Sequence, residues 1–532
     1  MNESEIATAA DIAAKRFETD KRIEAIKNTQ NLTPTTSKVY YVSSSTGSDS
    51  NSGTDPNAPL KTLSKAVSKA GKNSTICLKR GDTWRGTGGD TIIEAKEGYT
   101  ITAYGEGPKP VIISSRENGG GSANASKWTQ MAENPNIWRY EGSNNWNDVG
   151  NIIFNDGESY ATKVIQLYVK QESWSTYQIT DFTNAPAQKY NFDHWSDLRN
   201  DLDFFHDKNF SGGSGATGYL YMYSTSNPAL RFESIEFAED ITPIHITVDN
   251  VTVDNICFKY VGGHAIGASA YSLFKTSINN LTVENCEFYW IGGSVHNRIP
   301  QSIIGQNTGD SPKYDTRYGN AVEIWGGCNG YYVRNNYIYQ VFDAGITIQV
   351  TFDSSKNYTV NQKNIEFTDN VIEYCVYSIE YFLTKIPSGN ESTMENFKIS
   401  NNYMWNAGRG FCETRGVWDR GFAAHIKSQK TAPCNRAMGF EITDNVMVGI
   451  GSSFLSIRST FGENSLPLFE GNALYGYYDM DGTAKDGFQI GVVSGNTDGN
   501  EDDVAYDNGI EAYLVGQMGS QYGEGNKYYF IF

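Results

Sequence analysis

The sequence predicts an all-β solenoid, in which short parallel strands stack along one axis. An alternating apolar run, an Asn and a second alternating run recur along residues 246–448. The copies lie 30, 51, 34, 32 and 43 residues apart, and unequal spacing is typical of solenoid turns with loops of different length. One Asn marks the same corner of every copy: Asn255, Asn285, Asn336, Asn370, Asn402 and Asn445. A stacked ladder of Asn side chains in a parallel β-helix fits these observations better than an antiparallel sandwich.

The charge balance narrows the class of partner. Lys and Arg number 43 against 61 Asp and Glu, which leaves a formal charge of −18. A nucleic-acid partner is excluded, because binding to phosphates needs a positive field. A polyanionic substrate would need a bound cation or a local group of Arg and Lys.

Targeting segments and cysteine spacing place few further limits on the function. No apolar run approaches the ~18 residues of a membrane span, so we expect none. No signal peptide is visible in residues 1–30, although the fold class leads us to expect a location outside the cell or on its surface. The seven cysteines show no CxxC spacing, which favours buried small apolar residues over disulfides or a zinc site.

Five segments follow from these patterns. Residues 1–36 are an N-terminal helix, expected over 3–30, and a linker. The first part of the solenoid spans 37–126, and an inserted β module without the Asn repeat spans 127–238. Residues 239–460 form the main solenoid with the active site, and 461–532 cap its end. We expect the helix to cover the other end, because exposed strand edges invite pairing with other chains.

Residues 40–113 carry a more specific pattern. They contain YYVS, GSDSNSGT, KTL-x-KA, GDTWRG and ITAYG-x-G-x-P-x-I. This segment resembles the opening of right-handed parallel β-helix carbohydrate-active proteins, the pectate-lyase-like superfamily. The resemblance implies a right-handed parallel β-helix, shared by hydrolases, lyases and phage depolymerases. Residues 127–238 look like the small β module of some β-helix glycoside hydrolases, or are an ordinary structural insertion.

The second strand of each repeat carries the candidate chemistry. We align these strands on their apolar centres: Ile266, Val322, Ile346, Ile379, Phe411 and Leu455. Side chains alternate faces along a strand, so inward centres leave their neighbours facing outward. The outward set is then Glu323, Trp325, Asp343, Thr347, Gln349, Glu380 and Phe382, with Glu413 and Arg415 added by a bulge in the run CETR.

Paired carboxylates point to hydrolysis of glycosidic bonds. Glu323, Thr347 and Glu380 would form one outward row, with the two Glu backbones about 10 Å apart. Carboxyl groups ~5–5.5 Å apart suit a retaining glycosidase and ~6.5–9.5 Å an inverting one, and both remain open. Crowding of like charges would raise one pKa, as a proton donor requires. We expect Asp343 and Glu380 to be the principal carboxylates, with Glu323 and Glu413 as alternates.

Substrate-binding candidates surround these acids. Trp325 and Phe382 would stack on sugar rings, because exposed aromatics beside charge are costly without a ligand. The segment AAHIKSQK places His425 and Lys427 two residues apart, so an extended backbone would turn both to one side. Substrate hydroxyls or a carboxylate would be held by Gln349, Arg415, His425 and Lys427. The alternative is that this segment is an ordinary surface loop, in which His425 has no role in binding or catalysis.

A polysaccharide lyase is the main alternative. Glu380, Lys385 and Arg415 are similar to the acid–Lys–Arg arrangement of β-helix chondroitin and alginate lyases. That resemblance implies Ca²⁺ on Glu380, Lys385 as the base and Arg415 assisting. Those lyases carry a second acid where this chain has Ser378, so Asp343 would have to complete the calcium site.

A non-catalytic carbohydrate-binding β-helix or adhesin is the third class. It accounts for the aromatics but not for the converging acids. The sequence therefore favours a glycoside hydrolase that acts on a polysaccharide or oligosaccharide, with no cofactor required and Ca²⁺ as an option. Sugar, linkage and oligomeric state are not readable from the sequence.

Overall fold

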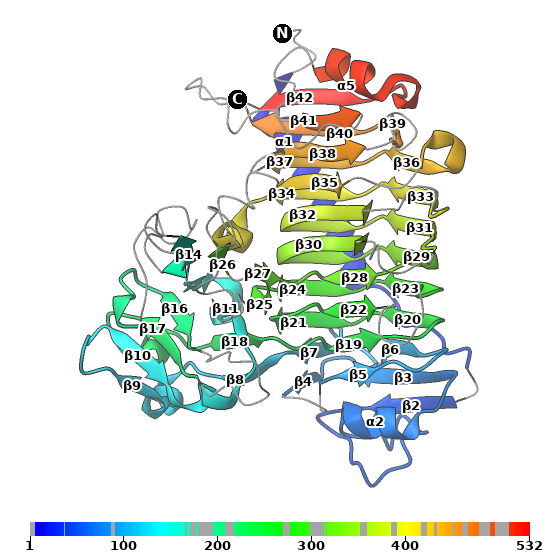
Figure 1. The fold of residues 1–532 in the computed structure, drawn as a ribbon. Helices are drawn as coiled ribbons and strands as arrows, with labels where there is room; N and C mark the ends of the chain where they lie inside the picture. Colours follow the sequence, from blue (N-terminus) through cyan, green and yellow to red (C-terminus); the bar gives the residue numbers. More distant parts are fainter. Residues whose placement is uncertain are drawn as a thin grey trace.

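The computed structural model of the chain is mostly β, with long parallel sheets and few helices (Figure 1). It describes residues 6–531 except 37, 87–90, 165–166, 171–176, 179–194, 208–217, 270–276, 298–312, 315, 352–358, 385–390, 416–422, 430–433, 451–452, 460–465, 478–489 and 495–509. Parallel strands from successive repeats pair in register, which makes the architecture solenoid-like. Three columns of strands result, named here the first, second and third columns.

The first column is a ten-stranded parallel sheet. Its strands are β2 (Lys38–Val42), β3 (Ser74–Lys79), β6 (Thr100–Tyr104), β20 (Val251–Asp254), β23 (Leu281–Glu284), β29 (Cys328–Arg334), β31 (Gln362–Thr368), β33 (Met394–Ser400), β36 (Phe440–Thr443) and β39 (Leu468–Glu470). These strands precede the Asn of each predicted repeat.

The second column follows the Asn bend. Its strands are β4 (Thr83–Arg85), β7 (Val111–Ile113), β21 (Cys257–Val261), β24 (Glu287–Ile291), the first parts of β30 (Tyr337–Thr351) and β32 (Val371–Thr384), β34 (Tyr403–Ala407), β37 (Val446–Ile450), β40 (Ala473–Tyr477), β42 (Lys527–Ile531) and β1 (Ile6–Ala7). The pair of β1 with β42 brings the two ends of the described chain side by side.

The third column carries the candidate site. Its strands are β5 (Ile93–Glu94), β19 (Ile244–Ile246), β22 (Ile266–Ser269), β28 (Val322–Trp325), the second parts of β30 and β32, β35 (Ala424–Gln429), β38 (Ser453–Ser459) and β41 (Ile490–Ser494). The long strands β30 and β32 take part in both columns, which therefore join into one 18-stranded sheet.

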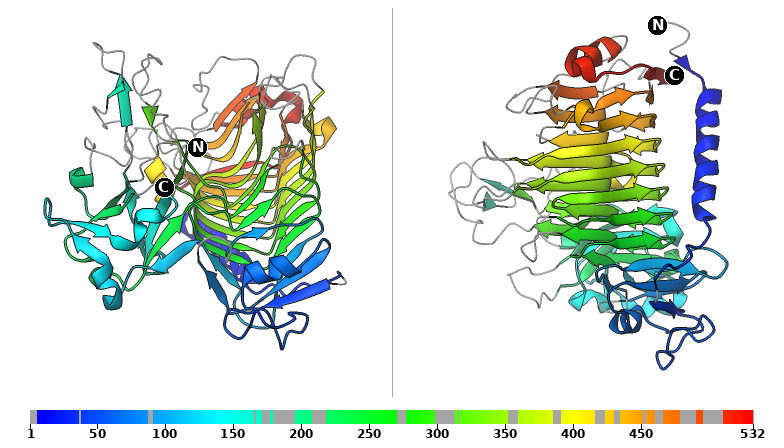
Figure 2. Two further views of the ribbon diagram at one scale, coloured as in Figure 1. Left: turned by 60° about the horizontal axis from the view of Figure 1, so that its bottom comes forward. Right: turned by 90° about the vertical axis from the view of Figure 1, so that its right-hand side faces the viewer.

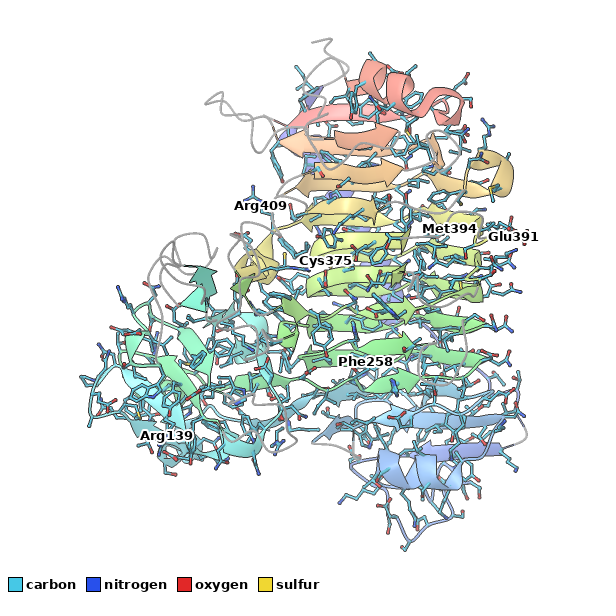
Figure 3. The ribbon with its side chains drawn as sticks, viewed as in Figure 1. Arg139, Phe258, Cys375, Glu391, Met394 and Arg409 are labelled. Carbon is cyan, nitrogen blue, oxygen red and sulfur yellow. The ribbon has the colours of Figure 1, made fainter. Side chains whose placement is uncertain are left out.

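One apolar core fills the space between the columns. It stacks like on like: the rings of Phe258 and Phe288 lie 5.2 Å apart at 12°, and those of Phe397 and Phe440 lie 5.1 Å apart at 6°. Figure 3 shows Phe258 and Cys375 within this stack. All seven cysteines are buried and none forms a disulfide, so they behave as the small buried residues that the sequence predicts. Burial of the apolar faces along the whole stack supplies the main stabilisation.

The Asn ladder exists, but the predicted register is wrong at its start. Buried side-chain amides donate to the next Oδ1 along the stack at 2.9–3.2 Å, through Asn336, Asn370, Asn402, Asn445, Asn472 and Asn526. Cys286 occupies the ladder position one turn earlier, where its backbone N–H donates to Asn336 Oδ1. Asn255 and Asn285 lie one residue before the ladder, in register with Asn335.

Two neighbouring positions therefore divide two tasks. The residue before the ladder takes the left-handed backbone, with φ between 53° and 61° at Asn255, Asn285, Asn335, Asp369, Asn401 and Asp444. Asn and Asp tolerate that conformation best after Gly. The following Asn satisfies buried backbone groups instead, as in the bond from Asn402 Nδ2 to Phe367 O at 2.8 Å.

A separate β unit interrupts the columns between β7 and β19. Two antiparallel-rich sheets form it, from β8 (Ser115–Asn118), β9 (Trp128–Gln130), β10 (Ile137–Tyr140), β11 (Val149–Phe154), β12 (Ser159–Tyr160), β13 (Thr162–Lys163), β16 (Asp203–His206), β17 (Leu220–Tyr223) and β18 (Ile235–Glu239). Its own aromatic core includes Trp128, Tyr140 and Phe237. Figure 2 shows it beside the stack, and Figure 3 labels Arg139 on its β10. Its first strand, β8, precedes residue 127.

The N-terminal helix, α1 (Ala9–Lys27), does not cover the end of the stack as expected. It begins with a capping box between Thr8 and Asp11 and then runs along one flank of the columns (Figure 2). Arg16 pairs there with Glu373, and Trp405 donates to Thr19 at 3.1 Å. Apolar side chains of α2 (Leu63–Lys69) and α5 (Ile510–Met518) enter the main core instead. Among the described helices, none combines the length and apolar character needed to cross a membrane.

Candidate active site

The third column presents one row of outward side chains. In register along it lie Gly267, Glu323, Thr347, Glu380, Lys427 and Ser456. The preceding residue of each strand is apolar and buried in the core. The structure thus brings Glu323, Thr347 and Glu380 into the row that their alternation predicts.

The alignment is wrong on the following turn. Ile379 pairs with Ile426 of β35, not with Phe411, because the run containing Phe411 forms a short 3₁₀ helix, η8 (Gly410–Arg415). Phe411 packs outside the stack against Phe342 and Trp290, with ring centroids 5.6 and 5.8 Å apart. The run around Phe411 and the run around Ile426 both have an apolar centre, and only tertiary packing determines which of them continues the stack.

Glu380 and Lys427 form a buried ion pair within the row. Lys427 Nζ lies 3.2 Å from Glu380 Oε1, and the side chains are 11% and 7% exposed. Burial raises the pKa of Glu380 above its ordinary value; Lys427 opposes this and Asp343 adds to it. Burial by itself lowers the pKa of Lys427. Tyr377 and Glu380 together raise it by more than burial lowers it, so the pKa lies above its ordinary value. The ammonium also lies 3.9 Å from the centre of the Tyr377 ring.

A second ion pair flanks the row, between Arg415 and Asp343. Helix η8 delivers Arg415, whose guanidinium lies 5.8 Å from the Phe342 ring and 5.9 Å from the Tyr377 ring. Asp343 stands at the bulge of β30, where the strand passes from the second column to the third. Arg415, named from sequence as a substrate ligand, therefore neutralises a candidate carboxylate.

Arg317, on β27 (Thr316–Tyr318), fastens η8 in place. Its guanidinium donates to three backbone carbonyls: Gly293 at 2.7 Å, Gly150 at 3.1 Å and Thr414 at 3.2 Å. Burial lowers its pKa to about 9. One side chain thus joins β11 of the inserted unit, the loop after β24 and the end of η8.

Glu323 is held by amides rather than by a cation. Asn320 Nδ2 and Gln349 Nε2 both donate to Glu323 Oε2, the latter at 3.0 Å. His264 Nδ1 lies 3.4 Å from the same oxygen. Asn320 also accepts from Ala344 N at 2.8 Å through its Oδ1, so it ties the Glu323 strand to the next. Gln349, expected to bind substrate, orients this carboxylate.

An aromatic pair lies beside the row. Trp325, Gln349 and Phe382 are in register, two positions after Glu323, Thr347 and Glu380. The Trp325 and Phe382 rings meet edge to face, 6.3 Å apart and at 85°. Both are half-buried, so ring surface remains for a ligand.

Two predicted site residues lie outside the row, and a third is not among the residues that the structure describes. His425 does not share a face with Lys427: it is fully buried, contacts Ser378 Oγ at 3.1 Å and Gly449 O at 2.8 Å, and burial lowers its pKa to about 3. Its ring centroid lies 5.6 Å from that of Phe454 in the main core, so position 425 faces inward. Glu413 lies in η8 and accepts from Gly410 N at 3.1 Å. Lys385, the alternative lyase base, lies outside the described residues.

The sequence reasoning missed His264, Asn320 and Arg317. Asn320 stands three residues before Glu323, and His264 two before Ile266, so both lie inside the aligned runs. A polar residue at the start of an otherwise apolar strand was the available signal. Arg317 lies outside every repeat and carried none.

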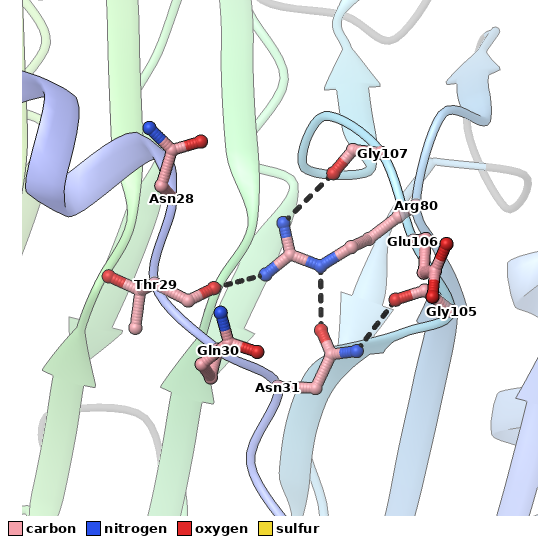
Figure 4. A pocket seen from close by; sticks show the side chains of 8 residues that line it. All are labelled: Asn28, Thr29, Gln30, Asn31, Arg80, Gly105, Glu106 and Gly107. Atoms are coloured by element: carbon pink, nitrogen blue, oxygen red, sulfur yellow. Dashed lines mark hydrogen bonds between the residues drawn. The ribbon is translucent and has the colours of Figure 1, made fainter.

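A pocket of about 350 Å³ lies apart from this row, where the segment after α1 crosses the stack (Figure 4). Arg80 lines it and donates to Thr29 O, Asn31 Oδ1, Gly107 O and Asn255 Oδ1. These bonds hold the N-terminal segment in place. No three His, Cys, Asp or Glu side chains gather in a metal-binding group within the part of the chain that the structure describes.

No protein-family model matches the chain. A segment of 106 residues is 36% identical to the lacto-N-biosidase of Bifidobacterium longum subsp. longum, and it covers 18% of this chain and 6% of that protein. Among solved structures, XylC with xylose has a TM-score of 0.38 at 13% identity and covers 82% of this chain and 69% of that one. GH136 lacto-N-biosidase from Eubacterium ramulus has a TM-score of 0.32 at 12% identity, covering 86% and 65%. A rhamnogalacturonan lyase has a TM-score of 0.26 at 10% identity, covering 83% and 69%.

These similar proteins are carbohydrate-active enzymes. At TM-scores below 0.5 the likeness carries no argument about the reaction, and the matched segment is a small part of the curated relative. The chemistry has to be argued from the row of charged side chains itself.

Proposed function

We propose that the protein is a glycoside hydrolase that cleaves glycosidic bonds with carboxylates of the outward row, on columns that wind as a right-handed parallel β-helix. One observation carries this: Glu380, buried and with a raised pKa, lies two strands from Glu323, a carboxylate held by two amides. A protonated and an ionised carboxyl group on one face are the two groups that glycoside hydrolysis needs.

Glu380 is the proton donor in this proposal. Burial favours its neutral form, and the negative charge of Asp343 favours it further. The pair with Lys427 occupies Oε1, which leaves Oε2 for the proton and the glycosidic oxygen. Asp343 acts here through its charge, held in position by Arg415.

Glu323 is the second carboxylate. Both amide donors meet its Oε2, so this oxygen is occupied as an acceptor and Oε1 remains for a water molecule or the sugar. Two strand spacings separate its backbone from that of Glu380, about 10 Å. Thr347 stands between them in the row, and this backbone spacing is compatible with both a retaining and an inverting pair of carboxyl groups.

Trp325 and Phe382 supply the apolar side of the binding site, beside the acids. A sugar ring stacked on the free part of either ring would lie next to Glu323 and Glu380. The reaction needs no metal ion or organic cofactor, and an oligosaccharide or polysaccharide substrate implies action outside the cell or on its surface. The 36% identical segment makes a lacto-N-bioside a substrate to include.

The test compares wild-type protein with E380Q and E323Q on 4-nitrophenyl glycosides of lacto-N-biose, glucose, galactose and xylose, and on neutral and uronic-acid polysaccharides. E366Q is the matched control, since Glu366 pairs with Arg334 at 2.6 Å on the first column, away from the row. We expect new reducing ends from the wild type and E366Q, and a loss of about 100-fold or more in E380Q.

Absorbance of unsaturated uronides, measured with and without EDTA, separates the lyase. Full activity of E380Q, or EDTA-sensitive absorbance without simple hydrolysis, would contradict the proposal. In the lyase alternative Ser378 stands where a second acid is needed, and its hydroxyl is engaged with His425.

A further inference from the structure

His264 lies beside Glu323 on the side away from Glu380. The backbone N–H of Asn320 points at His264 Nδ1 across 3.1 Å. The ring meets Tyr318 edge to face, with centroids 4.9 Å apart at 73°, and the Tyr318 hydroxyl donates to Asp240 at 2.6 Å. The imidazole plane is therefore held from two directions.

These contacts determine which nitrogen carries the proton. A backbone N–H can only donate, so His264 Nδ1 accepts and has no proton of its own. Protonation of Nδ1 would strip the Asn320 N–H of its acceptor, in a residue that is 2% exposed. The 3.4 Å approach of Nδ1 to Glu323 Oε2 is thus a contact with a neutral ring, not an ion pair. The neutral ring carries its hydrogen on Nε2.

That Nε2–H donor has no partner among the described residues, while the His264 side chain remains 19% exposed. In native structures nearly all polar groups that become buried have a hydrogen-bond partner. A donor held rigid beside a candidate carboxylate is therefore available to a ligand.

The next position of the outward row has no side chain of its own. Gly267 is in register with Glu323 and is buried, so its backbone lies beneath neighbouring side chains. A Cβ at this position would lie 3.1 Å from Thr242 Cγ2 and 3.6 Å from His264 Cβ, which shows that these two side chains flank it. A larger side chain at 267 would displace Thr242 or the His264 ring, which cover this position.

We propose that His264 and Gly267 form a sugar-binding subsite next to Glu323, in which Nε2–H donates to a hydroxyl of the sugar unit adjoining the cleaved bond. The subsite suits a neutral sugar, because Glu323 and Asp240 lie beside it and His245, the next position of the row, lies 2.8 Å from Glu94. Lys427 of the row and Arg415 beside it each pair with a carboxylate on the far side of Glu323. This inference rests on the proposed hydrolase function.

Two replacements separate the ring's roles. In H264Q the side-chain amide can place an N–H where Nε2 lies, whereas in H264N the amide reaches only the place of Nδ1. We expect H264N to raise KM on the glycoside panel about fivefold or more, as loss of one neutral hydrogen bond does, with H264Q close to wild type. G267V should raise KM as H264N does, while V67A on α2, far from the row, serves as the control.

A second readout needs no turnover. The ¹⁵N shifts of the histidine rings, assigned to His264 by their loss in H264Q, should show a neutral Nε2–H form at pH 7. Titration with free glucose, galactose or xylose should shift the His264 signal in the wild type and not in G267V. A proton on Nδ1, an imidazolium, or equal loss of activity in H264N and H264Q would overturn the assignment.

The two proposals fail separately. If the wild type hydrolyses nothing in the panel, the hydrolase function fails, and the subsite stands or falls on the sugar-induced shift alone. If the wild type is active but KM is unchanged in H264N and G267V, only the subsite is rejected.

Discussion

Lys427 follows Glu380 in the outward row, and its ammonium lies 3.2 Å from the Glu380 carboxylate in a site that is almost closed to solvent. Burial of two such groups costs desolvation on both sides, so the pair contributes little net stability. In the proposed reaction the cation tunes the proton donor.

The pH profile of hydrolysis should move in opposite directions in K427M and D343N. The positive charge of Lys427 lowers the Glu380 pKa and the negative charge of Asp343 raises it. A general acid must be protonated, so activity falls as the pH rises through its pKa. The alkaline limb of kcat/KM should therefore move to higher pH in K427M and to lower pH in D343N.

The control for this comparison is K398M. Lys398 pairs with Glu441 at 3.8 Å on the first column and should leave the limb unchanged. Shifts of the same sign in K427M and D343N would remove Glu380 from the role of acid.

Replacing a buried Asn of the ladder should destabilise the protein far more than replacing the residue before it, which has the left-handed backbone conformation. Asn402 accepts from Asn370 and donates to Phe367 O and Asn445 Oδ1, so N402A leaves several buried groups without partners. We expect a loss of roughly 3 kcal/mol or more in the free energy of unfolding. N401G, at φ 55° on the exposed side, should cost less than about 1 kcal/mol. Equal urea midpoints for the two variants would contradict the assignment.

His425 should destabilise the protein as the pH falls. Its pKa is about 3 in the folded chain against an ordinary value of 6.5. The unfolded chain therefore takes up the proton first, and the contribution of His425, complete above pH 6.5, is lost as the pH falls toward 3. Between pH 7 and pH 5 the loss is about 2 kcal/mol.

Urea midpoints of the wild type and H425Q across this range check the prediction. The unfolding free energy of the wild type minus that of H425Q should decrease as the pH falls, because only the wild type loses the contribution of His425. A constant difference would mean that His425 is charged or accessible in the folded protein.

The attachment of α1 should depend on Lys109. Its buried ammonium bonds Ile26 O at 2.5 Å, at the end of the helix, together with Asn285 O at 2.6 Å and Asn255 Oδ1 at 3.1 Å. A cation at the C-terminal carbonyls complements the helix dipole, and K109M removes it. We expect faster hydrogen exchange of the α1 amides in K109M, whereas K72M, which breaks an exposed pair with Glu97, should leave them unchanged. Unaltered α1 exchange in K109M would assign the anchoring to the pair of Arg16 with Glu373.

Local patterns carried most of the fold. The alternation of the repeats and the recurring Asn predicted parallel stacking, and the apolar centres from Ile266 to Ile379 have the register that the structure shows. These features depend on residues close together in the chain, which a periodic pattern can reveal. The one-residue shift of the ladder at Asn285 escaped this reading, because both bend positions favour Asn.

The long-range contacts decided the rest. Whether Phe411 or Ile426 continues the stack depends on the aromatic cluster around Phe342, and the inward position of His425 depends on its contacts with Gly449 and Phe454 of later turns. By itself the sequence determined a mostly β, solenoid-like chain with acids on the outer face of one column, because side chains alternate along strands. Only the tertiary structure decided that Lys427 pairs with Glu380, Arg415 with Asp343 and Gln349 with Glu323, because those partners come from different turns and meet only when the columns stack.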